Sequence, residues 1–300
     1  MKIGIDIGGS HIAVGLINNE NIIAKKERDI EEQDKHNIEQ FIINIIVKFI
    51  NELLEEYNLT INEIELIGIA SPGTIKNGII IKATNLEIKN FNILKELKKF
   101  FSIEIKIRND AKCSTLAEKN YGSMKGYNDF VYLCLGTGIG SGVVLNNKLL
   151  EPKRYEGFEL GHMLIEKEGK LCSCNKKGCW EQYASMRIFK QELIKKLNLD
   201  EDTNSYKLLE LLRINREDKI INEIIDNYVE NLALGIENII NIFEPEAICI
   251  GGSFVFFREI LLEKLIEKLK EENATFNHEN LPEIKCAELL NDAGILGAII

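Results

Sequence analysis

The feature that most constrains the fold is a pattern that occurs twice in the chain. Residues 2–25 read as a short strand, a glycine turn at 8–10, a second strand, an Asn-Asn turn and a third strand. The same order recurs at 130–150, where the glycine turn lies at 136–138 and the second Asn-Asn turn keeps the same spacing from it. Two copies of one β-meander predict a duplicated α/β architecture with two facing lobes. Chance similarity between two glycine-rich hairpins is the alternative.

Other segments show helical or strand periodicity. Residues 65–70 and 103–108 read as strands. Apolar residues recur at helical spacing in 37–57, which predicts an amphipathic helix. The following ranges also read as helices: 91–101, 186–197, 206–212, 218–243, 258–272 and the start of a short one at 294–300. No Pro- or Ser-rich linker interrupts the chain, so we expect closely hinged lobes. The predicted division is a small N-terminal lobe of 1–109, completed by about 290–300, and a large C-terminal lobe of 110–289.

The composition is that of a folded protein with an acidic surface. Of the 300 residues, 45% are hydrophobic and 28% are charged, which excludes disordered and low-complexity chains. The net charge of −10 argues against a nucleic-acid partner, because neutralising phosphates requires surplus Lys and Arg. A protein of this charge can still bind phosphate compounds through backbone amides and Mg²⁺.

The chain shows no sign of secretion or of a membrane span. The first apolar stretch is short and interrupted by Asp6, and the longest apolar run, 41–50, is too short to cross a bilayer. We therefore expect a cytoplasmic protein with no membrane partner. Disulfides are rare in that compartment, so the seven cysteines call for another explanation.

Three glycine turns follow predicted strands and could hold phosphates. Asp6 stands just before the first turn, where a carboxylate could bind Mg²⁺ directly or through water. Glycines let a backbone approach a phosphate closely and point N–H groups at it. A single glycine turn of this kind is common in β-hairpins and indicates no ligand, but the three together favour a nucleotide site between the lobes. Their candidate residues are Asp6, Gly8, Gly9 and Ser10, then Thr137 and Gly138, then Gly251 and Gly252.

Asn109-Asp110 follows a strand and precedes a helix. A carboxylate at 110 could accept the proton of a substrate hydroxyl as its oxygen attacks a γ-phosphate. Asn and Asp are also common helix N-caps, and the residues alone favour that structural interpretation.

A Cys₃His set is the sharpest local signal. His162, Cys172, Cys174 and Cys179 fall within a short stretch, which in a cytosolic chain indicates a closed, tetrahedral structural Zn²⁺ site rather than disulfides. Unrelated buried cysteines are the alternative. Glu159 and Glu181 flank this set, where they could bind a polyhydroxylated substrate; two solvated surface acids are the simpler interpretation.

Taken together, these motifs resemble those of the ROK family of bacterial sugar kinases. The family's D-x-G-G-[TS] stands at 6–10, its E-x-G-H at 159–162 and its C-x-C-G-x-x-G-C-x-E at 172–181, and the similarity runs nearly end to end. The resemblance implies the actin-like ATPase fold, a duplicated ribonuclease-H-like domain with the active site in the cleft between two lobes.

The resemblance also implies roles for the candidate residues. Asp110 would be the general base that activates the C6 hydroxyl of a hexose, and the three glycine turns would hold Mg-ATP. His162 would both ligate Zn²⁺ and contact the sugar. The residues that would surround the sugar are Gly73, Asn85, Asn109, Asp110, Glu159, His162 and Glu181.

Three residues depart from the family pattern. Asn175 replaces a glycine after the second cysteine, and Asn tolerates a positive φ better than most residues. Phe158 stands where small residues are common, and Ile88 stands where many glucokinases of the family carry Trp. These departures bear on the identity of the sugar more than on the reaction.

We therefore expect a kinase that transfers phosphate from ATP to the C6 hydroxyl of N-acetylmannosamine, which is slightly favoured, or of glucose. Glucokinase activity as the main activity is the alternative, and the phosphoryl donor range stays open. A sugar-sensing repressor of the same family is a different class of function, disfavoured by the acidic charge and by a first strand that starts at Lys2. A third class, an actin- or chaperone-like ATPase, would not explain the Cys₃His set. A homodimer or homotetramer is expected because many relatives form them.

Overall fold

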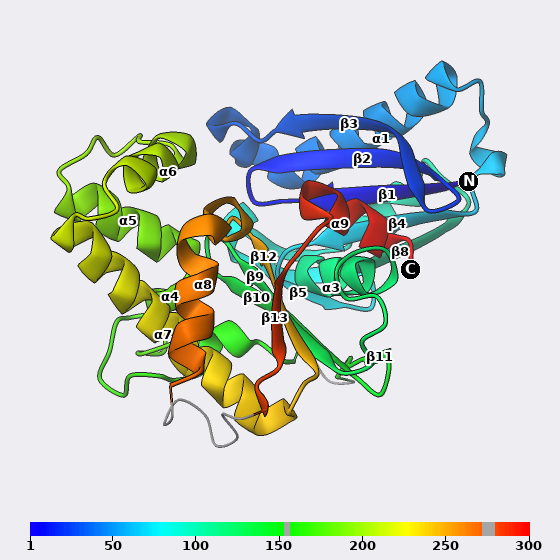
Figure 1. Ribbon diagram of the computed structural model, residues 1–300. Helices are drawn as coiled ribbons and strands as arrows, with labels where there is room; N and C mark the ends of the chain where they lie inside the picture. Colours follow the sequence, from blue (N-terminus) through cyan, green and yellow to red (C-terminus); the bar gives the residue numbers. More distant parts are fainter. Residues whose placement is uncertain (153–156, 272–279) are drawn as a thin grey trace. The chain divides into compact units, whose positions relative to one another are not determined.

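The computed structural model describes residues 1–152, 157–271 and 280–300, which divide into two compact units. Unit 1 comprises Met1–Gly126, Leu149–Gly157 and Leu289–Ile300, and unit 2 comprises Tyr127–Lys148 and Phe158–Glu288 (Figure 1). The sequence placed residues from 110 onward in the second lobe, whereas by contacts the helix α3 (Asp110–Asn120) groups with unit 1. The reason is that α3 packs against the C-terminal helix α9 (Ala293–Ala298). The functional lobe boundaries stay a prediction.

Each unit contains a five-stranded sheet, and the two sheets share one topology. The strands of unit 1 are β1 (Lys2–Ile7), β2 (His11–Asn18), β3 (Asn21–Asp29), β4 (Leu66–Ser71) and β8 (Glu104–Asn109). Those of unit 2 are β9 (Phe130–Leu135), β10 (Ile139–Leu145), β11 (Lys148–Leu149), β12 (Ala247–Gly252) and β13 (Glu283–Cys286). The orders are β3-β2-β1-β4-β8 and β11-β10-β9-β12-β13. In both, the first meander strand pairs antiparallel with the second and parallel with a later strand, so the predicted duplication is confirmed.

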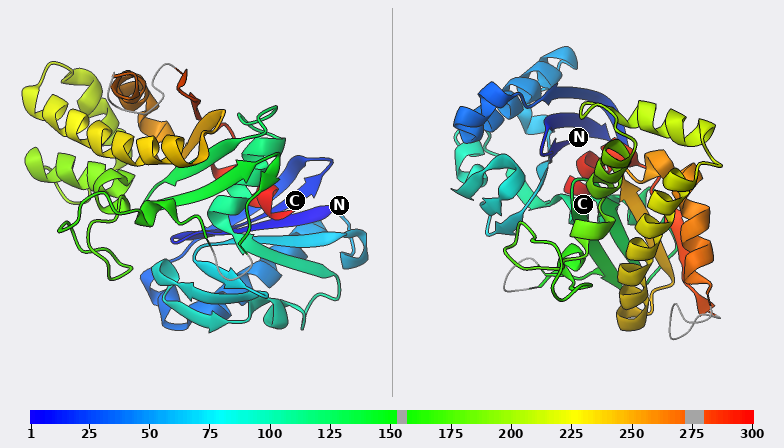
Figure 2. Two further views of the ribbon diagram at one scale, coloured as in Figure 1. Left: turned by 90° about the horizontal axis from the view of Figure 1, so that it is seen from below. Right: turned by 90° about the vertical axis from the view of Figure 1, so that its left-hand side faces the viewer.

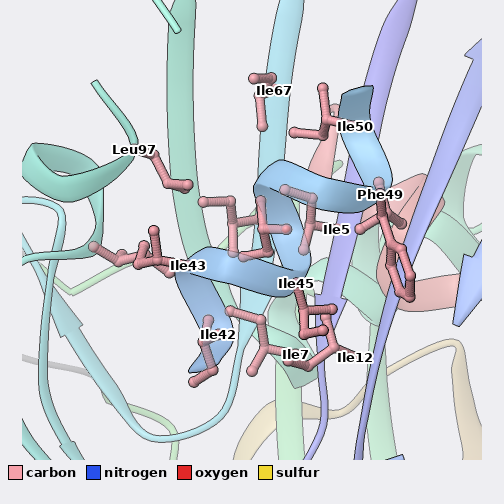
Figure 3. Packing of buried hydrophobic residues seen from close by; sticks show 14 of the residues in the cluster. Ile5, Ile7, Ile12, Ile42, Ile43, Ile45, Phe49, Ile50, Ile67 and Leu97 are labelled. Atoms are coloured by element: carbon pink, nitrogen blue, oxygen red, sulfur yellow. The ribbon is translucent and has the colours of Figure 1, made fainter. Parts of the chain in front are cut away.

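One face of the unit 1 sheet packs against the helix α1 (Ile38–Glu56), which closely matches the predicted helix at 37–57. Alternate residues of β1, Ile3, Ile5 and Ile7, point to this face and are fully buried. Figure 3 shows side chains of α1, among them Ile42, Ile45 and Phe49, packed over the strands. Burying these branched apolar side chains on both elements fixes the helix to the sheet.

The opposite face of the same sheet is covered by α9. A side chain at Gly4 or Gly68 would collide with the backbone of Ile295 or Ala298, so glycine is required where this helix lies directly on the strands. Ile295 of α9, and Ile299 directly after the helix, pack against Ala13 and Ile17 of β2. This arrangement places the start of α9 next to the carboxyl end of β1.

A small three-stranded sheet in unit 1 corrects one prediction. The helix expected over 91–101 is wrong in extent: β7 (Ile88–Phe91) pairs with β6 (Ile79–Ala83), which pairs with β5 (Thr74–Lys76), and only α2 (Ile93–Leu97) is helical. Asn92 caps α2 by accepting a hydrogen bond from the Lys95 N–H. Phe91 and Phe101 are both buried, but neither belongs to α2. The apolar residues of 91–101 therefore come from the end of a strand, a short helix and a loop, and not from one long helix.

Unit 2 carries most of the helices. The predicted helical segments are confirmed as α5 (Met186–Lys196), α6 (Ser205–Ile214), α7 (Lys219–Phe243) and α8 (Arg258–Leu269), with a short α4 (Glu181–Ala184) before them. In Figure 2 the yellow α7 lies beside the yellow-green α5, and both α5 and α8 contact α7. Within the described ranges, no helix combines the length and apolarity needed to cross a membrane.

Candidate functional site

Unit 1 brings two carboxylates to one edge of its sheet. Asp6 lies at the carboxyl end of β1 and Asp110 directly follows β8, and both strands pair in parallel with β4 between them. The carboxyl ends of parallel strands share one edge, which is the usual place for ligands in open α/β sheets. The Asp6 side chain is 16% exposed, its Oδ2 lies 4.0 Å from His11 Nε2, and a side chain at Gly294 would collide with its carboxyl group.

Burial changes the acidity of Asp6. Loss of water around the carboxylate, and secondly the negative charge of Asp110, raise the pKa of Asp6 to about 7, against a smaller opposing effect of Lys25. Two nearby acids at a sheet edge disfavour ionisation of both together. A cation bound between them would relieve that repulsion.

The Asn109-Asp110 pair separates the two roles that the sequence left open. Asn109 is the N-cap of α3, since its Oδ1 accepts hydrogen bonds from the N–H groups of Ala111 and Lys112. Its Nδ2 donates to the Gly73 carbonyl at 3.1 Å. Asp110 is the first residue of the helix, and its Oδ1 also accepts from the Ala111 N–H, at 2.8 Å. Asn109 thus joins Gly73 to the end of β8.

The first glycine turn lies beside Asn85. A side chain at Gly9 would come within 3.4 Å of Asn85 Cβ, and the Gly8 N–H closes the turn on the His11 carbonyl at 2.8 Å. The unit 1 candidates Asp6, Gly8, Gly9, Ser10, Gly73, Asn85, Asn109 and Asp110 therefore follow the ends of β1, β4 and β8 or lie next to these ends.

Unit 2 brings the four predicted metal ligands together. The ligand atoms of His162, Cys172, Cys174 and Cys179 all lie within 4.8 Å of one another, and all seven cysteines are free. The Cys174 and Cys179 sulfurs are 3.5 Å apart, as are the Cys172 sulfur and His162 Nδ1. Ligands about 2.3 Å from a tetrahedral Zn²⁺ would be separated by roughly 3.8 Å, so the donor set and its spacing fit that cation. Asn175 adopts φ +68°, as a replacement for glycine must.

Glu181 connects this cluster to the second glycine turn. Its Oε1 accepts from the Cys172 thiol at 3.2 Å and lies 3.9 Å from His162 Nδ1. Its Oε2 lies so close to Gly138 that a side chain there would come within 2.6 Å of it. The Glu181 side chain is 13% exposed, so the interpretation as a solvated surface acid does not hold for this residue. A carboxylate thus stands directly beside the backbone of the turn at 136–138.

Glu159 leads into a single 3₁₀ turn, Leu160–His162, and is exposed. The residue before it, Phe158, has φ +62°, which is strained for a bulky side chain. This conformation is held by Ser141, whose hydroxyl donates to the Phe158 carbonyl and accepts from the Leu160 N–H. The Phe158 ring packs on Phe243 with centroids 6.3 Å apart. Glycine at 158 would adopt this positive φ without strain, whereas the phenylalanine found there is stabilised by its contact with Phe243.

Gly251 and Gly252 end β12 beside the strand that leads into the turn at 136–138. Gly251 pairs with Cys134 and Gly252 with Leu135. Gly252 has φ +69°, and a side chain at Gly251 would meet the Tyr132 hydroxyl. Both glycines are required by the local geometry, and the exposed backbone of Gly252 lies at the same sheet edge as Thr137 and Gly138.

The structure therefore groups the candidates into two sets, one at the sheet edge of each unit. It adds one residue that no motif indicated. Arg187 donates from its backbone N–H to the Gly136 carbonyl at 3.1 Å and from Nε to the Thr137 carbonyl at 3.1 Å. A lone arginine early in a helix carries no sequence signal for such a contact, because only the packing of α5 brings it to the turn.

Comparison with known proteins places this geometry in context. The chain is 34% identical to a glucokinase from Thermotoga maritima, covering 99% of this chain and 95% of the relative. It is 30% identical to a xylose repressor from Caldicellulosiruptor bescii, over 99% of this chain and 76% of the relative. The fold matches a ROK family glucokinase from Streptomyces griseus, solved with glucose and AMPPNP, with a TM-score of 0.80 and 23% identity over 99% and 97% of the two chains.

The fold match to this glucokinase, together with matches to two further solved structures at TM-scores of 0.77 and 0.82, confirms the actin-like ATPase fold expected from the resemblance. Kinases and repressors both occur among the relatives, so the similarity alone does not separate the two functions. The match to the family covers residues 2–300, and the chain belongs to the ROK family.

Proposed function

We propose that this protein is an ATP-dependent sugar kinase that phosphorylates the C6 hydroxyl of a hexose, with Asp110 as the general base. The observation that carries the proposal is the pair of acids in unit 1. Asp6 and Asp110 lie at one sheet edge, close enough for the charge of Asp110 to raise the pKa of Asp6. A repressor needs to bind a sugar, whereas two adjacent carboxylates next to a glycine turn suit phosphoryl transfer, in which one binds a cation and the other accepts a proton.

Asp110 would accept the proton of the sugar hydroxyl while that oxygen attacks the γ-phosphate. Asn109 and Gly73, which are hydrogen-bonded to each other, and Asn85 would contact hydroxyls of the same sugar. In unit 2, Glu159, His162 and Glu181 would supply acceptors for further hydroxyls. Carboxylates and amides are suited to this task because a sugar presents several hydroxyl donors and acceptors at fixed positions.

We also propose that ATP and Mg²⁺ bind at the glycine turns, because these turns offer backbone N–H groups for phosphates and a nearby carboxylate for the cation. Mg²⁺ prefers oxygen ligands and would lie by Asp6. The backbone of Gly8, Gly9 and Ser10, and likewise that of Thr137 and Gly138, would bind phosphate oxygens. Gly251 and Gly252 would leave room beside the nucleoside. When bound, Mg²⁺ neutralises charge on the transferred phosphoryl group.

Zn²⁺ is proposed to act on structure alone. A Cys₃His set fills all four tetrahedral positions, so no site would remain for a water or a substrate. Zn²⁺ would take the place of the thiol proton that Cys172 now donates to Glu181 Oε1, so the metal would hold Glu181 through the chain of 172–181 and not through that hydrogen bond.

The acceptor is proposed to be glucose or N-acetylmannosamine. The absence of Trp at position 88 favoured N-acetylmannosamine, yet Ile88 is 1% exposed and part of the unit 1 core. The 34% identical relative named a glucokinase supports glucose. Phe158, which stands where small residues are common in the family, directly precedes the sugar-binding candidate Glu159, so it would bear on which sugar is accepted.

The test is ADP release with a panel of glucose, N-acetylmannosamine, N-acetylglucosamine, fructose and allose. We expect sugar-dependent ADP release that is highest with one of the first two. ADP release with none of the five would contradict the kinase proposal, and release of equal rate without sugar would indicate an ATPase.

A sugar-sensing regulator is the second candidate, and the 30% identity to a xylose repressor is the observation that favours it. It predicts sugar binding by calorimetry without any phosphoryl transfer. An operator-length DNA duplex titrated with the protein, with and without sugar, separates the two functions, because the kinase proposal expects no DNA binding at a net charge of −10.

Location in the cytoplasm and assembly as a homodimer or homotetramer belong to the same proposal. Free thiols at all seven cysteines suit a reducing compartment. Light scattering of the purified protein measures the assembly directly.

A further inference from the structure

Arg187 holds the second glycine turn through two different groups. It is the second residue of α5, and its backbone N–H donates to the Gly136 carbonyl while its Nε donates to the Thr137 carbonyl. The turn is closed by the Gly136 N–H, which donates to the Gly138 carbonyl at 3.0 Å. Two consecutive carbonyls of the turn are thus fixed by one residue that belongs to a different element.

Fixing the carbonyls also fixes the amide groups of the turn. In a planar trans peptide the N–H points away from the C=O of the same unit, and the described chain contains no cis peptide bond. Because the carbonyls of Gly136 and Thr137 point at Arg187, the N–H groups of Thr137 and Gly138 point to the opposite side. Across the described ranges, neither N–H has a hydrogen-bond acceptor in a turn, loop or side chain.

Consecutive unpaired N–H groups that point the same way form an anion-binding concavity. The rest of the Arg187 guanidinium is engaged as well: one terminal nitrogen donates to Gln191 Oε1 at 3.2 Å and the other to Gln182 Oε1 at 3.4 Å. Gln182 follows Glu181, whose Oε2 lies beside Gly138. Arg187 therefore also ties the turn to the segment that carries Glu181.

We propose that Arg187 is a positioning residue that orients the peptide groups of 136–138 so that the Thr137 and Gly138 N–H groups bind the phosphates of the nucleotide. The assignment rests on the proposed function, because it takes the turn to be a nucleotide site. Arg187 acts through the turn and does not touch the reacting atoms. Its charge strengthens the hydrogen bond to the Thr137 carbonyl relative to a neutral donor.

The test compares Arg187→Ala, Arg187→Lys and Arg213→Ala in the full-length protein. Arg213 is a matched control, since it is an exposed arginine of unit 2 that forms an ion pair with Glu259, outside the turn. The measurements are the affinity for Mg-AMPPNP by calorimetry, KM for ATP, KM for the sugar, and the unfolding midpoint.

Arg187→Ala should weaken Mg-AMPPNP binding and raise KM for ATP at least about tenfold, the effect of losing one charge-assisted hydrogen bond. KM for the sugar and the unfolding midpoint should stay near the wild-type values. Arg187→Lys should recover part of the affinity, because an ammonium can donate to the Thr137 carbonyl but cannot also reach both glutamines. Arg213→Ala should bind nucleotide as the wild type does.

If the wild type binds Mg-AMPPNP and Arg187→Ala binds it equally well, the assignment of Arg187 is overturned while the proposed function stands. Equal loss of nucleotide affinity, sugar affinity and stability would show a general structural role and would also overturn it. A wild-type protein that does not bind Mg-AMPPNP would overturn both the assignment and the proposed function.

Discussion

The two copies of the meander share a topology but differ in what their turns carry. The first copy has the mostly buried Asp6 just before its turn, and the second has Cys134 at the equivalent position. The residues between the paired strands are 8–11 in the first copy and 136–138 in the second, so the second hairpin is tighter. The first turn lies beside a carboxylate suited to a cation, whereas the second is held by Arg187 and presents backbone N–H groups. The two copies thus share the strand order of the sheet, whereas different residues at their turns give the turns different chemistry.

The largest expected effect concerns the acid of the first unit. Asp110→Asn should lower kcat at least about a hundredfold, because an amide cannot accept the proton of the sugar hydroxyl. Binding of sugar and of Mg-AMPPNP, measured by calorimetry, should change little. Asp202→Asn, in the loop between α5 and α6, is the control and should retain full activity. If Asp110→Asn turned over normally, the base would have to be another group.

The next effect distinguishes two glycines of the second turn. A side chain at Gly138 would collide with Glu181 Oε2, whereas one at Gly136 meets nothing within 4 Å. Gly138→Ala should therefore raise KM for the sugar at least about tenfold, since small displacements of a positioning carboxylate are costly. Gly136→Ala should stay within about twofold. Equal KM values for the two variants would mean that Glu181 does not contact the sugar.

Removal of the metal should have a smaller effect, confined to unit 2. Cys174→Ser should lose the bound zinc, lower the unfolding midpoint and weaken sugar binding, because Glu181 would no longer be held by a fixed cluster. Metal analysis of the wild type should find about one zinc per chain. Cys286→Ser, a cysteine outside the cluster, should keep the metal. A wild type that holds no metal when purified without chelators would refute the zinc site.

The smallest effect is a pH dependence that belongs to unit 1. The pKa of Asp6 is raised from 3.8 to about 7 in the folded protein. The folded state therefore binds the proton more tightly than the unfolded chain, so the contribution of Asp6 to stability is complete below pH 4 and is lost as the pH rises toward 7. In metal-free buffer, Asp6→Asn should abolish this part of the decline in the unfolding midpoint between pH 4 and 7. Identical pH profiles of wild type and variant would show that Asp6 is not buried as described.

Much of the fold could be predicted from local pattern. The two meanders follow from their glycine and Asn-Asn turns, and α1 and α7 follow from apolar periodicity, because these two helices are long and buried along one side. The small sheet of β5, β6 and β7 was missed, since its strands are short and their apolar residues continue into α2 with helical spacing.

The candidate site could be predicted only in part. Cysteines and histidine stand close in sequence, so their cluster was visible, whereas the contact between Glu181 and Gly138 joins residues that are far apart. Asn109 and Asp110 were ambiguous as a pair until the structure assigned the cap to Asn109. Arg187 could not have been found, because a hydrogen bond to a carbonyl leaves no motif.

The central claim is that Asp110 accepts the proton of the C6 hydroxyl of a hexose while that oxygen attacks the γ-phosphate of ATP. Phosphorus NMR of a reaction with ATP and glucose or N-acetylmannosamine, with the 6-deoxy sugar in parallel, tests it most directly. We predict a phosphomonoester at C6 with the wild type, none with the 6-deoxy sugar, and none within the same time with Asp110→Asn. Phosphate on another hydroxyl, or the same product from Asp110→Asn, would contradict the account.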